Sequence, residues 1–200
     1  KPRRSGEAEE MIEQLMICAN QAAAKLAKEK GLPFVYRVHG HPEQRRIDTL
    51  IELLDALGVS AKEIRQGEPK TKDFAAILER VRDTPAQRVI SHQLLRTMDK
   101  ARYSTEPIGH FGLALADYSH FTSPIRRYPD TAIHRILSAL CEGKSPAEIG
   151  RMYGGFAQNA AEESSRLEVR AMAAERSAED CYMAEYIRQH IGETFTGVIS

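Results

Sequence analysis

The 200-residue chain carries 28 basic and 28 acidic side chains, so we expect one domain with its own core, and any nucleic-acid site must be a local basic patch. Its three cysteines, Cys18, Cys141 and Cys181, are too far apart to predict a zinc site or a disulfide framework, which indicates a reducing cytoplasm. No apolar run approaches the roughly 20 residues of a membrane span, and the start lacks a signal peptide's apolar core, so no membrane partner is expected.

The first expected element is a helix that begins after Ser5 or Gly6 and ends near Lys30. Acidic side chains occupy its first turn, as the helix dipole favours, and Gly31 followed by Pro33 ends the pattern. Apolar residues recur at steps of three and four and predict the buried stripe of this helix: Met11, Leu15, Ala19, Ala22 and Leu26.

Glu13 and Asn20 interrupt the apolar plan of this helix. They are seven residues apart, which is two helical turns, so both project on one face. A polar pair at that spacing is either ordinary solvated surface or part of a site, and the spacing alone leaves both interpretations open.

Shorter elements follow the first helix. Residues 34–38 are apolar and β-branched enough for a strand, and His39 and His41 lie in the turn behind it. Two histidines without a third ligand predict a solvated loop rather than a metal site. Three helices are expected next, at about residues 42–57, 71–84 and 85–101. A loop at residues 104–109 follows them.

Functional chemistry is densest between residues 110 and 135. Ser123-Pro124 and Tyr128-Pro129 each predict entry into a helical turn, because proline presets the dihedral of a first helical residue and has no amide to leave unpaired. Arg126 and Arg127 therefore lie at helix-initiating backbone, where unpaired amides favour an anion. The natural ligand is a phosphate, which arginine binds with two parallel donors.

The rings of His120, Phe121 and Tyr128 are close enough in sequence to offer stacking faces for unpaired bases, which suggests single-stranded nucleic acid. A packing interpretation stays open, in which the two arginines pair with Asp130 and neighbouring acids while the rings fill a core. Asp130 is also one turn from His134. This pair either orients the imidazole towards a phosphate or makes a local hydrogen bond with no catalytic role.

The last third of the chain is expected to be helical. A helix over about residues 129–140 precedes a short helix that Ser145-Pro146 caps and Gly154-Gly155 ends, and a long helix then runs over about residues 156–190. Small side chains on the long helix predict close approach of another helix along one seam: Ala160, Ser164, Leu167, Ala171, Ala174, Ala178 and Cys181. The acids Glu175, Glu179 and Asp180 are interpreted as surface charge, with Glu175 as an exception that is taken up below. The fold class is therefore mainly α, with a few short strands.

The dense stretch closely resembles the signature of the ribonuclease II and ribonuclease R family: His-Phe-Gly-Leu, then Thr-Ser-Pro-Ile-Arg-Arg-Tyr-Pro-Asp, then His-Arg. The resemblance extends upstream to residues 12–20 and downstream to residues 174–176. It implies that residues 1–192 are the C-terminal helical part of an RNB catalytic domain, which is α+β as a whole. It also implies that residues 193–200 begin the first strand of a following OB-fold RNA-binding domain.

The resemblance further implies a magnesium-dependent, hydrolytic exoribonuclease that removes nucleoside 5′-monophosphates from the 3′ end of single-stranded RNA. The family holds Mg²⁺ with a cluster of aspartates N-terminal to this region, and no such cluster occurs in the sequence. We therefore expect no metal ligands in this chain and no activity from it alone. Its expected partners within one protein are the N-terminal half of the catalytic domain and flanking OB-fold domains.

The resemblance also assigns roles to single residues. Arg126 is expected to be catalytic by neutralising charge on the phosphate under attack, and Glu13 to position the last ribose. Four further residues are expected to contact RNA: Arg127, Tyr128, His134 and Glu175.

Two alternatives belong to other functional classes. The first is a non-catalytic RNA-binding or scaffold module with the same fold, and closely spaced aspartates upstream of Lys1 would decide against it. The second is a helical protein-interaction domain, in which Arg126 and Arg127 would both be paired internally with carboxylates. If the chain is half of a larger domain, some apolar surface should be exposed where the other half docks.

Overall fold

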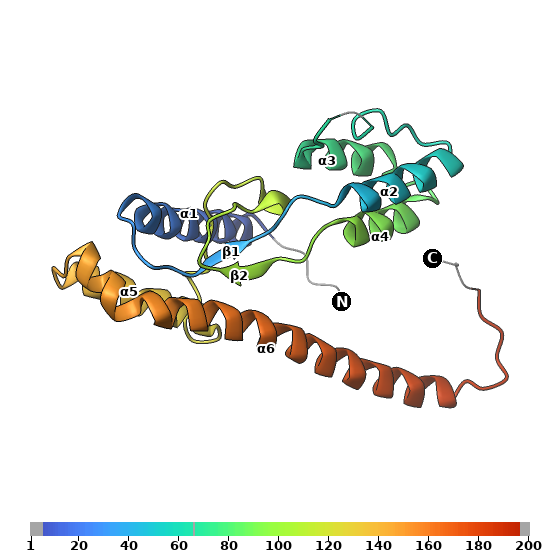
Figure 1. Ribbon diagram of the computed structural model, residues 1–200. Coiled ribbons are helices and arrows are strands. Elements are labelled where there is room, and N and C mark those ends of the chain that lie inside the picture. The colour runs from blue at the N-terminus through green and yellow to red at the C-terminus, as the bar shows by residue number, and fades with distance from the viewer. Residues whose placement is uncertain (1–5, 66, 197–200) are drawn as a thin grey trace.

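The computed structural model describes residues 6–65 and 67–196, and over these residues the chain is mainly helical, as expected (Figure 1). Two short strands, β1 (Tyr36–Val38) and β2 (Arg102–Ser104), pair antiparallel with Tyr36 opposite Ser104. The helices and one 3-10 turn are, in chain order, α1 (Glu7–Glu29), α2 (Gln44–Ala56), α3 (Thr71–Arg80), α4 (Gln87–Thr97), η1 (Phe111–Leu113), α5 (Tyr128–Cys141) and α6 (Pro146–Arg188).

The pairing of β1 with β2 divides the molecule into two cores, because all of α2, α3 and α4 lie in the chain between the two strands. Figure 1 shows these helices grouped at one end, with the strand pair between them and α1 and α5. The core of the inserted helices includes Ile47, Leu50, Leu54, Phe74, Ile77, Ile90 and Leu94. The other core joins α1, both strands, α5 and the first part of α6. The candidate site belongs to this second core.

The buried face of α1 is not the expected one. Met11 and Leu15 are each 59% exposed. The residues that face the core are Asn20, Ala23, Ala24 and Ala27. Small side chains let the helix backbone approach the core closely, and this tertiary packing overrides the apolar periodicity. The larger apolar side chains of α1 consequently remain on the surface.

His39 follows β1 and is buried, whereas the sequence predicted a solvated loop histidine. Its Nδ1 accepts a hydrogen bond from the Gly112 amide at 2.7 Å, and its Nε2 lies 2.7 Å from the Asp99 carbonyl oxygen. A Cβ atom on Gly112 would come within 2.8 Å of Nδ1, so this contact requires glycine. Both ring nitrogens of His39 are therefore engaged, one with the segment that follows α4 and one with the start of the dense stretch.

The helix α6 is a single 43-residue helix and is not broken at Gly154-Gly155. Its expected start is confirmed: Ser145 caps it, and Glu148 hydrogen-bonds back to the Ser145 amide. The glycines cost about 1 kcal/mol each relative to alanine, which the packing of neighbouring alanines outweighs. Ala157, Ala160 and Ala161 are buried in the core shared with α5.

The second half of α6 runs apart from the other helices (Figure 1). From residue 169 to residue 189 every side chain is exposed. The expected seam is therefore covered only at its start: Ala160 is buried and Ser164 half-buried, but no other described helix covers the rest. The apolar surface expected for half of a larger domain is thus present on both α1 and α6.

The residues after α6 show no strand up to Thr196, and the rest of the segment 193–200, where the first strand of an OB-fold was expected, lies outside the described residues. Among the helices that the structure describes, none is both long enough and apolar enough to cross a membrane.

Candidate nucleic-acid site

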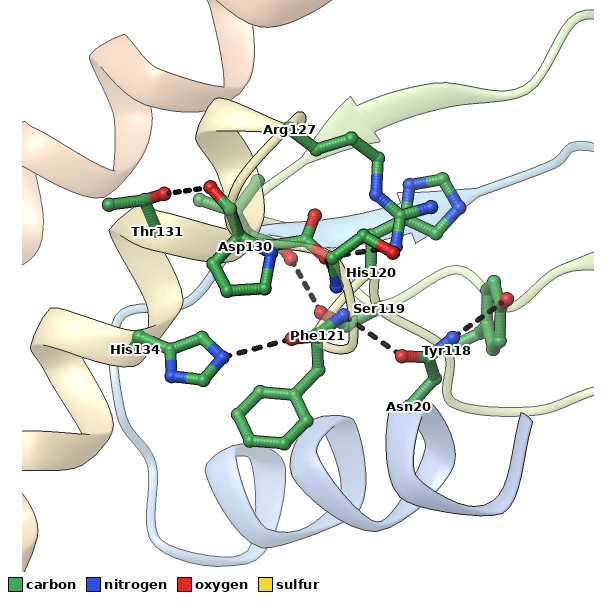
Figure 2. A network of polar contacts seen from close by, with 12 residues as sticks. Asn20, Tyr118, Ser119, His120, Phe121, Arg127, Asp130, Thr131 and His134 are labelled. Atoms are coloured by element: carbon green, nitrogen blue, oxygen red, sulfur yellow. Dashed lines mark hydrogen bonds and ion pairs between the residues drawn. The ribbon is translucent and has the colours of Figure 1, made fainter. Parts of the chain in front are cut away.

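The dense stretch forms a turn between Phe121 and Tyr128 that is fastened to α1 by Asn20 (Figure 2). The buried side-chain oxygen of Asn20 accepts a hydrogen bond from the Phe121 amide at 2.9 Å, and its amide nitrogen donates to the Tyr118 hydroxyl at 3.1 Å. Asn20 was noticed in the sequence only as a polar interruption of an apolar helix. Its partners, about 100 residues away in the chain, explain the interruption.

The other end of the turn is held by Asp130, whose side chain is fully buried in the first turn of α5. One carboxylate oxygen accepts hydrogen bonds from the Ser123 amide at 2.8 Å and from the Arg127 guanidinium at 2.9 Å. Its second oxygen and the Arg127 Nε are buried without a hydrogen-bond partner. The packing interpretation therefore holds for Arg127, and the Arg127–Asp130 pair ties α5 to the turn.

Arg126 is oriented differently from its neighbour. Its side chain is exposed, and its guanidinium makes no hydrogen bond or ion pair with any residue in the described ranges. The backbone amides of both arginines donate to the Ser123 carbonyl oxygen, at 3.3 and 3.1 Å, which closes the turn just before α5. The packing interpretation does not hold for Arg126.

Two cavities meet at this turn. A cavity of about 200 Å³ lies between the turn and α1, and its lining includes Glu13, Asn20, Tyr118 and Arg126. A larger one of about 730 Å³ lies between the turn and α6. The structure thus brings Glu13 and Arg126, which are more than 100 residues apart in sequence, to one cavity.

Three other residues singled out from the sequence lie in different surroundings. Tyr128 is 56% exposed and lines the larger cavity. His134 lines neither cavity: its Nε2 lies 2.9 Å from the Phe121 carbonyl oxygen, and its ring stacks on Phe121 with centroids 4.3 Å apart. The hydrogen bond considered between His134 and Asp130 is not formed. Glu175 is exposed on α6, one turn beyond the wall of the larger cavity.

A polar cluster beside the larger cavity was not found from the sequence. Arg37 forms two hydrogen bonds with Glu168, at 2.7 and 3.0 Å, and its guanidinium carbon lies 4.6 Å from the centroid of the Tyr103 ring. The Tyr103 hydroxyl is 3.0 Å from the His120 Nδ1. These residues come from four segments of the chain, so no local pattern links them. Only the pairing of β1 with β2 and the packing of α6 bring them together.

Burial decides the protonation of this cluster. Burial, together with the nearby positive charges of Arg127 and Arg37, lowers the pKa of the His120 imidazole to about 3. Burial likewise raises the pKa of the Tyr103 hydroxyl. At neutral pH both groups are therefore uncharged, and they present hydrogen-bonding atoms without a charge.

The described part of the chain contains no group of three or more His, Cys, Asp or Glu side chains placed to hold a metal ion. Near the turn, Asp130 is committed to Arg127 and Glu168 to Arg37, which leaves Glu13 as an isolated carboxylate in the small cavity. These residues do not fit a magnesium site. The turn offers the guanidinium of Arg126 and the exposed ring of Tyr128, and α1 adds the carboxylate of Glu13. These groups suit a phosphate, a base and a ribose, respectively.

Comparison with known proteins finds clear relatives. The family described as RNB domain matches residues 1–143. Ribonuclease R 1 of Lactococcus lactis is 40% identical over all of this chain, which covers 24% of that protein, and ribonuclease R of Thermotoga maritima is 40% identical, with 28% of it covered. The chain thus spans about a quarter of the length of these relatives.

Solved structures show the same similarity. The structure of Mycoplasma genitalium RNase R in complex with ribose methylated single-stranded RNA superposes with a TM-score of 0.87 at 31% identity, over 98% of this chain and 31% of that one. The structure of yeast Ssd1, described as a pseudonuclease, shares the fold over 77% of this chain, with a TM-score of 0.55 at 22% identity and 20% of that chain covered.

Proposed function

This chain belongs to the RNB domain family, and we propose that it is the helical, RNA-binding part of the catalytic domain of a 3′→5′ exoribonuclease. The whole enzyme would hydrolyse single-stranded RNA to nucleoside 5′-monophosphates in the cytoplasm. Residues 1–192 would belong to the catalytic domain and residues 193–200 to a following OB-fold. The similarity to ribonuclease R supports the class of enzyme, and the geometry of the turn supports the role of this part.

The observation that carries the proposal is the free guanidinium of Arg126 beside Glu13. A fixed turn that leaves one arginine unpaired at a cavity has a positive charge available for an anion. Arginine binds a phosphate through two parallel donors, and such charge-assisted hydrogen bonds are about twice as strong as neutral ones. A phosphate diester of RNA supplies both the charge and the shape.

Each side chain then has a distinct role. Arg126 binds the phosphate nearest the 3′ end and neutralises the charge that develops on it during hydrolysis. Glu13 accepts hydrogen bonds from the hydroxyls of the terminal ribose, which fixes the orientation of the scissile bond. Tyr128 offers its exposed ring to a base.

The remaining residues act at a greater distance from the phosphate. Arg127 holds the turn through Asp130, and it also belongs to the lining of both cavities. His134 supports the turn through the Phe121 carbonyl oxygen and does not reach the phosphate. Glu175 contacts RNA only if the RNA strand continues along α6 beyond the larger cavity.

Mg²⁺, when held by aspartates from the N-terminal half of the catalytic domain, would supply activated water and stabilise the leaving oxygen. The carboxylates of this chain do not fit that task, and its own contribution is to bind and orient the RNA. We therefore propose the N-terminal half and flanking OB-fold domains as partners within one protein. The exposed apolar side chains of α1 and α6 provide surface for that docking.

A second candidate is a non-catalytic RNA-binding module. The likeness to a pseudonuclease shows that this fold also occurs in a protein described in that way. The two candidates make the same use of Arg126 and Glu13 for binding and differ only in whether hydrolysis follows. Closely spaced aspartates upstream of Lys1 would decide for the enzyme.

The proposal is tested with the purified chain and a 3′-labelled single-stranded RNA. We expect the chain to bind this RNA, to release no mononucleotides with Mg²⁺, and to gain that activity when the aspartate-bearing half is added. Arg126→Ala, in an exposed position, serves as the matched variant that should bind and cleave less without unfolding. Release of mononucleotides by the chain alone, or an absence of RNA binding, would contradict the proposal.

A further inference from the structure

The direction of the hydrogen bonds around Asn20 is fixed by the backbone (Figure 2). The Phe121 amide can only donate, so the group of Asn20 that faces it is the side-chain oxygen. The side-chain nitrogen of Asn20 therefore faces the Tyr118 hydroxyl, 3.1 Å away, and this nitrogen can only donate. The hydroxyl oxygen of Tyr118 must accept this hydrogen bond, and its own single proton points elsewhere.

The Tyr118 hydroxyl has no acceptor for its proton within residues 6–65 and 67–196, where Asn20 is its one hydrogen-bond partner. Tyr118 is only 8% exposed, so bulk water has little access to it. A buried donor that lacks an acceptor costs free energy. Tyr118 lines the cavity of about 200 Å³ together with Glu13 and Arg126, and a ligand in this cavity can supply the acceptor.

Tyr118 differs from the other polar groups of this lining. Arg126 donates through a charged fork, and Glu13 only accepts. The hydroxyls of Thr122 and Ser123 rotate and can either donate or accept, so they do not select one kind of partner. Tyr118 instead presents an uncharged donor whose direction is fixed. Because the guanidinium takes the phosphate, an uncharged oxygen of the nucleotide is left as the acceptor for Tyr118.

We propose that Tyr118 is a specificity-determining residue for the sugar, and that its hydroxyl donates a hydrogen bond to a hydroxyl oxygen of the terminal ribose. This inference rests on the proposed function, in which Glu13 accepts from the same ribose. A ribose hydroxyl both donates and accepts, and the two side chains satisfy both capacities. A site built to hydrogen-bond a hydroxyl rejects an analogue that lacks it, because the buried partner is left unpaired.

The test measures three ligands of the intact 200-residue chain by isothermal titration calorimetry: 5′-AMP, its 2′-deoxy analogue and its 3′-deoxy analogue. All three carry the phosphate for Arg126, and each analogue lacks one ribose hydroxyl. Tyr118→Phe removes only the phenolic hydroxyl and should lower the affinity for 5′-AMP by about two- to tenfold, which corresponds to one uncharged hydrogen bond.

The two analogues identify the contacted oxygen. The analogue that lacks the contacted hydroxyl should bind Tyr118→Phe no more weakly than the native chain, and the other analogue should lose as much affinity as 5′-AMP. Tyr36→Phe is the matched control, because Tyr36 is also a buried tyrosine but lines neither cavity at the turn. It should change none of the three affinities, and melting temperatures should confirm that all variants are folded.

A purely structural role of Tyr118 gives a different pattern. Loss of the acceptor for the Asn20 amide would move the turn and weaken all three ligands by one common factor. Such an equal loss, or an unchanged affinity of Tyr118→Phe for 5′-AMP, would overturn the inference. The proposed function survives either result if Arg126→Ala weakens all three ligands. Binding of none of them by the native chain would contradict the proposed function and the inference together.

Discussion

The turn between Phe121 and Tyr128 has a buried side and an open side, and adjacent arginines belong to different ones. Arg127 occupies the N-cap position of α5, three residues before Asp130, and its guanidinium donates a hydrogen bond to that buried carboxylate. Arg126, one residue earlier, points to the cavities and has no partner in the described structure. Two arginines that differ by one position at the start of a helix thus have different roles. Arg127 stabilises the fold, and Arg126 is free to bind a ligand.

The two sides depend on each other. Fastening the turn with Asn20 and Asp130 costs the free energy of burying polar groups, including a carboxylate oxygen and the Arg127 Nε without partners. In return, the backbone around Arg126 is held in one conformation before a ligand arrives, which lowers the entropic cost of binding. Changes on the buried side should therefore lower stability, and changes on the open side should lower function.

The largest effect on stability is expected for Asp130→Ala. The change leaves Arg127 partly buried without its counter-charge and the Ser123 amide without its acceptor, which should cost about 3–5 kcal/mol. Urea denaturation followed by circular dichroism measures the free energy of unfolding. Asp130→Asn keeps an acceptor for the amide and should lose less. A cost below about 1 kcal/mol in the alanine variant would show that the buried side is not fastened by this residue.

Asn20→Ala should have the next largest effect. It leaves the part-buried Phe121 amide and the Tyr118 hydroxyl without their partner, at a cost of about 1–3 kcal/mol. Gln14→Ala is a suitable control, since Gln14 is exposed on the same helix and should change stability by no more than about 0.5 kcal/mol. Equal stability of the two variants would contradict the account of Asn20.

A pH dependence is expected from two half-buried histidines of the dense stretch, His110 and His120. Burial lowers the pKa of His120 to about 3 and that of His110 to about 4, below the ordinary value of 6.5. The unfolded chain therefore binds protons between these values that the folded chain does not, so stability should fall as pH falls below 6.5. Carboxylates with lowered pKa values lose their contribution only below about pH 4.5.

The histidine contribution is isolated by measuring melting temperature between pH 7 and pH 5. His120→Gln should flatten part of the slope in this window, because glutamine keeps a hydrogen-bonding side chain and does not titrate. His92→Gln, at an exposed position on α4, serves as the comparison against which the slope of His120→Gln is judged. An unchanged slope in His120→Gln would show that His120 does not carry the effect.

The smallest effect is expected on the open face of α1. Leu15→Ser changes a side chain that is 59% exposed and should alter stability by no more than about 0.5 kcal/mol. Ile136→Ala, in the core beneath the turn, should cost about 2–5 kcal/mol. If Leu15→Ser proved as costly as the core substitution, the apolar stripe predicted from the sequence would be buried after all.

Much of the fold follows from local patterns. The helix positions, the Ser145 cap and the turn that places two arginines before α5 depend on spacing and on proline, which act over a few residues. The resemblance to the ribonuclease signature likewise identified the family from consecutive residues. These features were predicted because each is decided within one segment of the chain.

What the sequence did not predict depends on partners far along the chain. The buried face of α1, the buried His39 and the Tyr103–His120 contact each require two or more segments to meet. The unbroken α6 shows the same, because packing of its alanines outweighs the two glycines. The sequence also could not show which of Arg126 and Arg127 would pair with Asp130, because both lie within four residues of it.

The central claim, that Arg126 serves the RNA and Arg127 serves the fold, is tested most directly by comparing Arg126→Lys with Arg127→Lys in the full-length protein. Turnover on single-stranded RNA and melting temperature are measured for the same preparations. Arg126→Lys keeps the charge but loses the planar two-donor fork, so turnover should fall about ten- to a hundredfold or more while the melting temperature is unchanged. Binding to long RNA should fall less, because other phosphate contacts share that work.

For Arg127→Lys the account predicts a lower melting temperature, because its contact with the buried Asp130 is disturbed. Full turnover with a lowered melting temperature in Arg126→Lys would contradict the account and assign Arg126 to the fold.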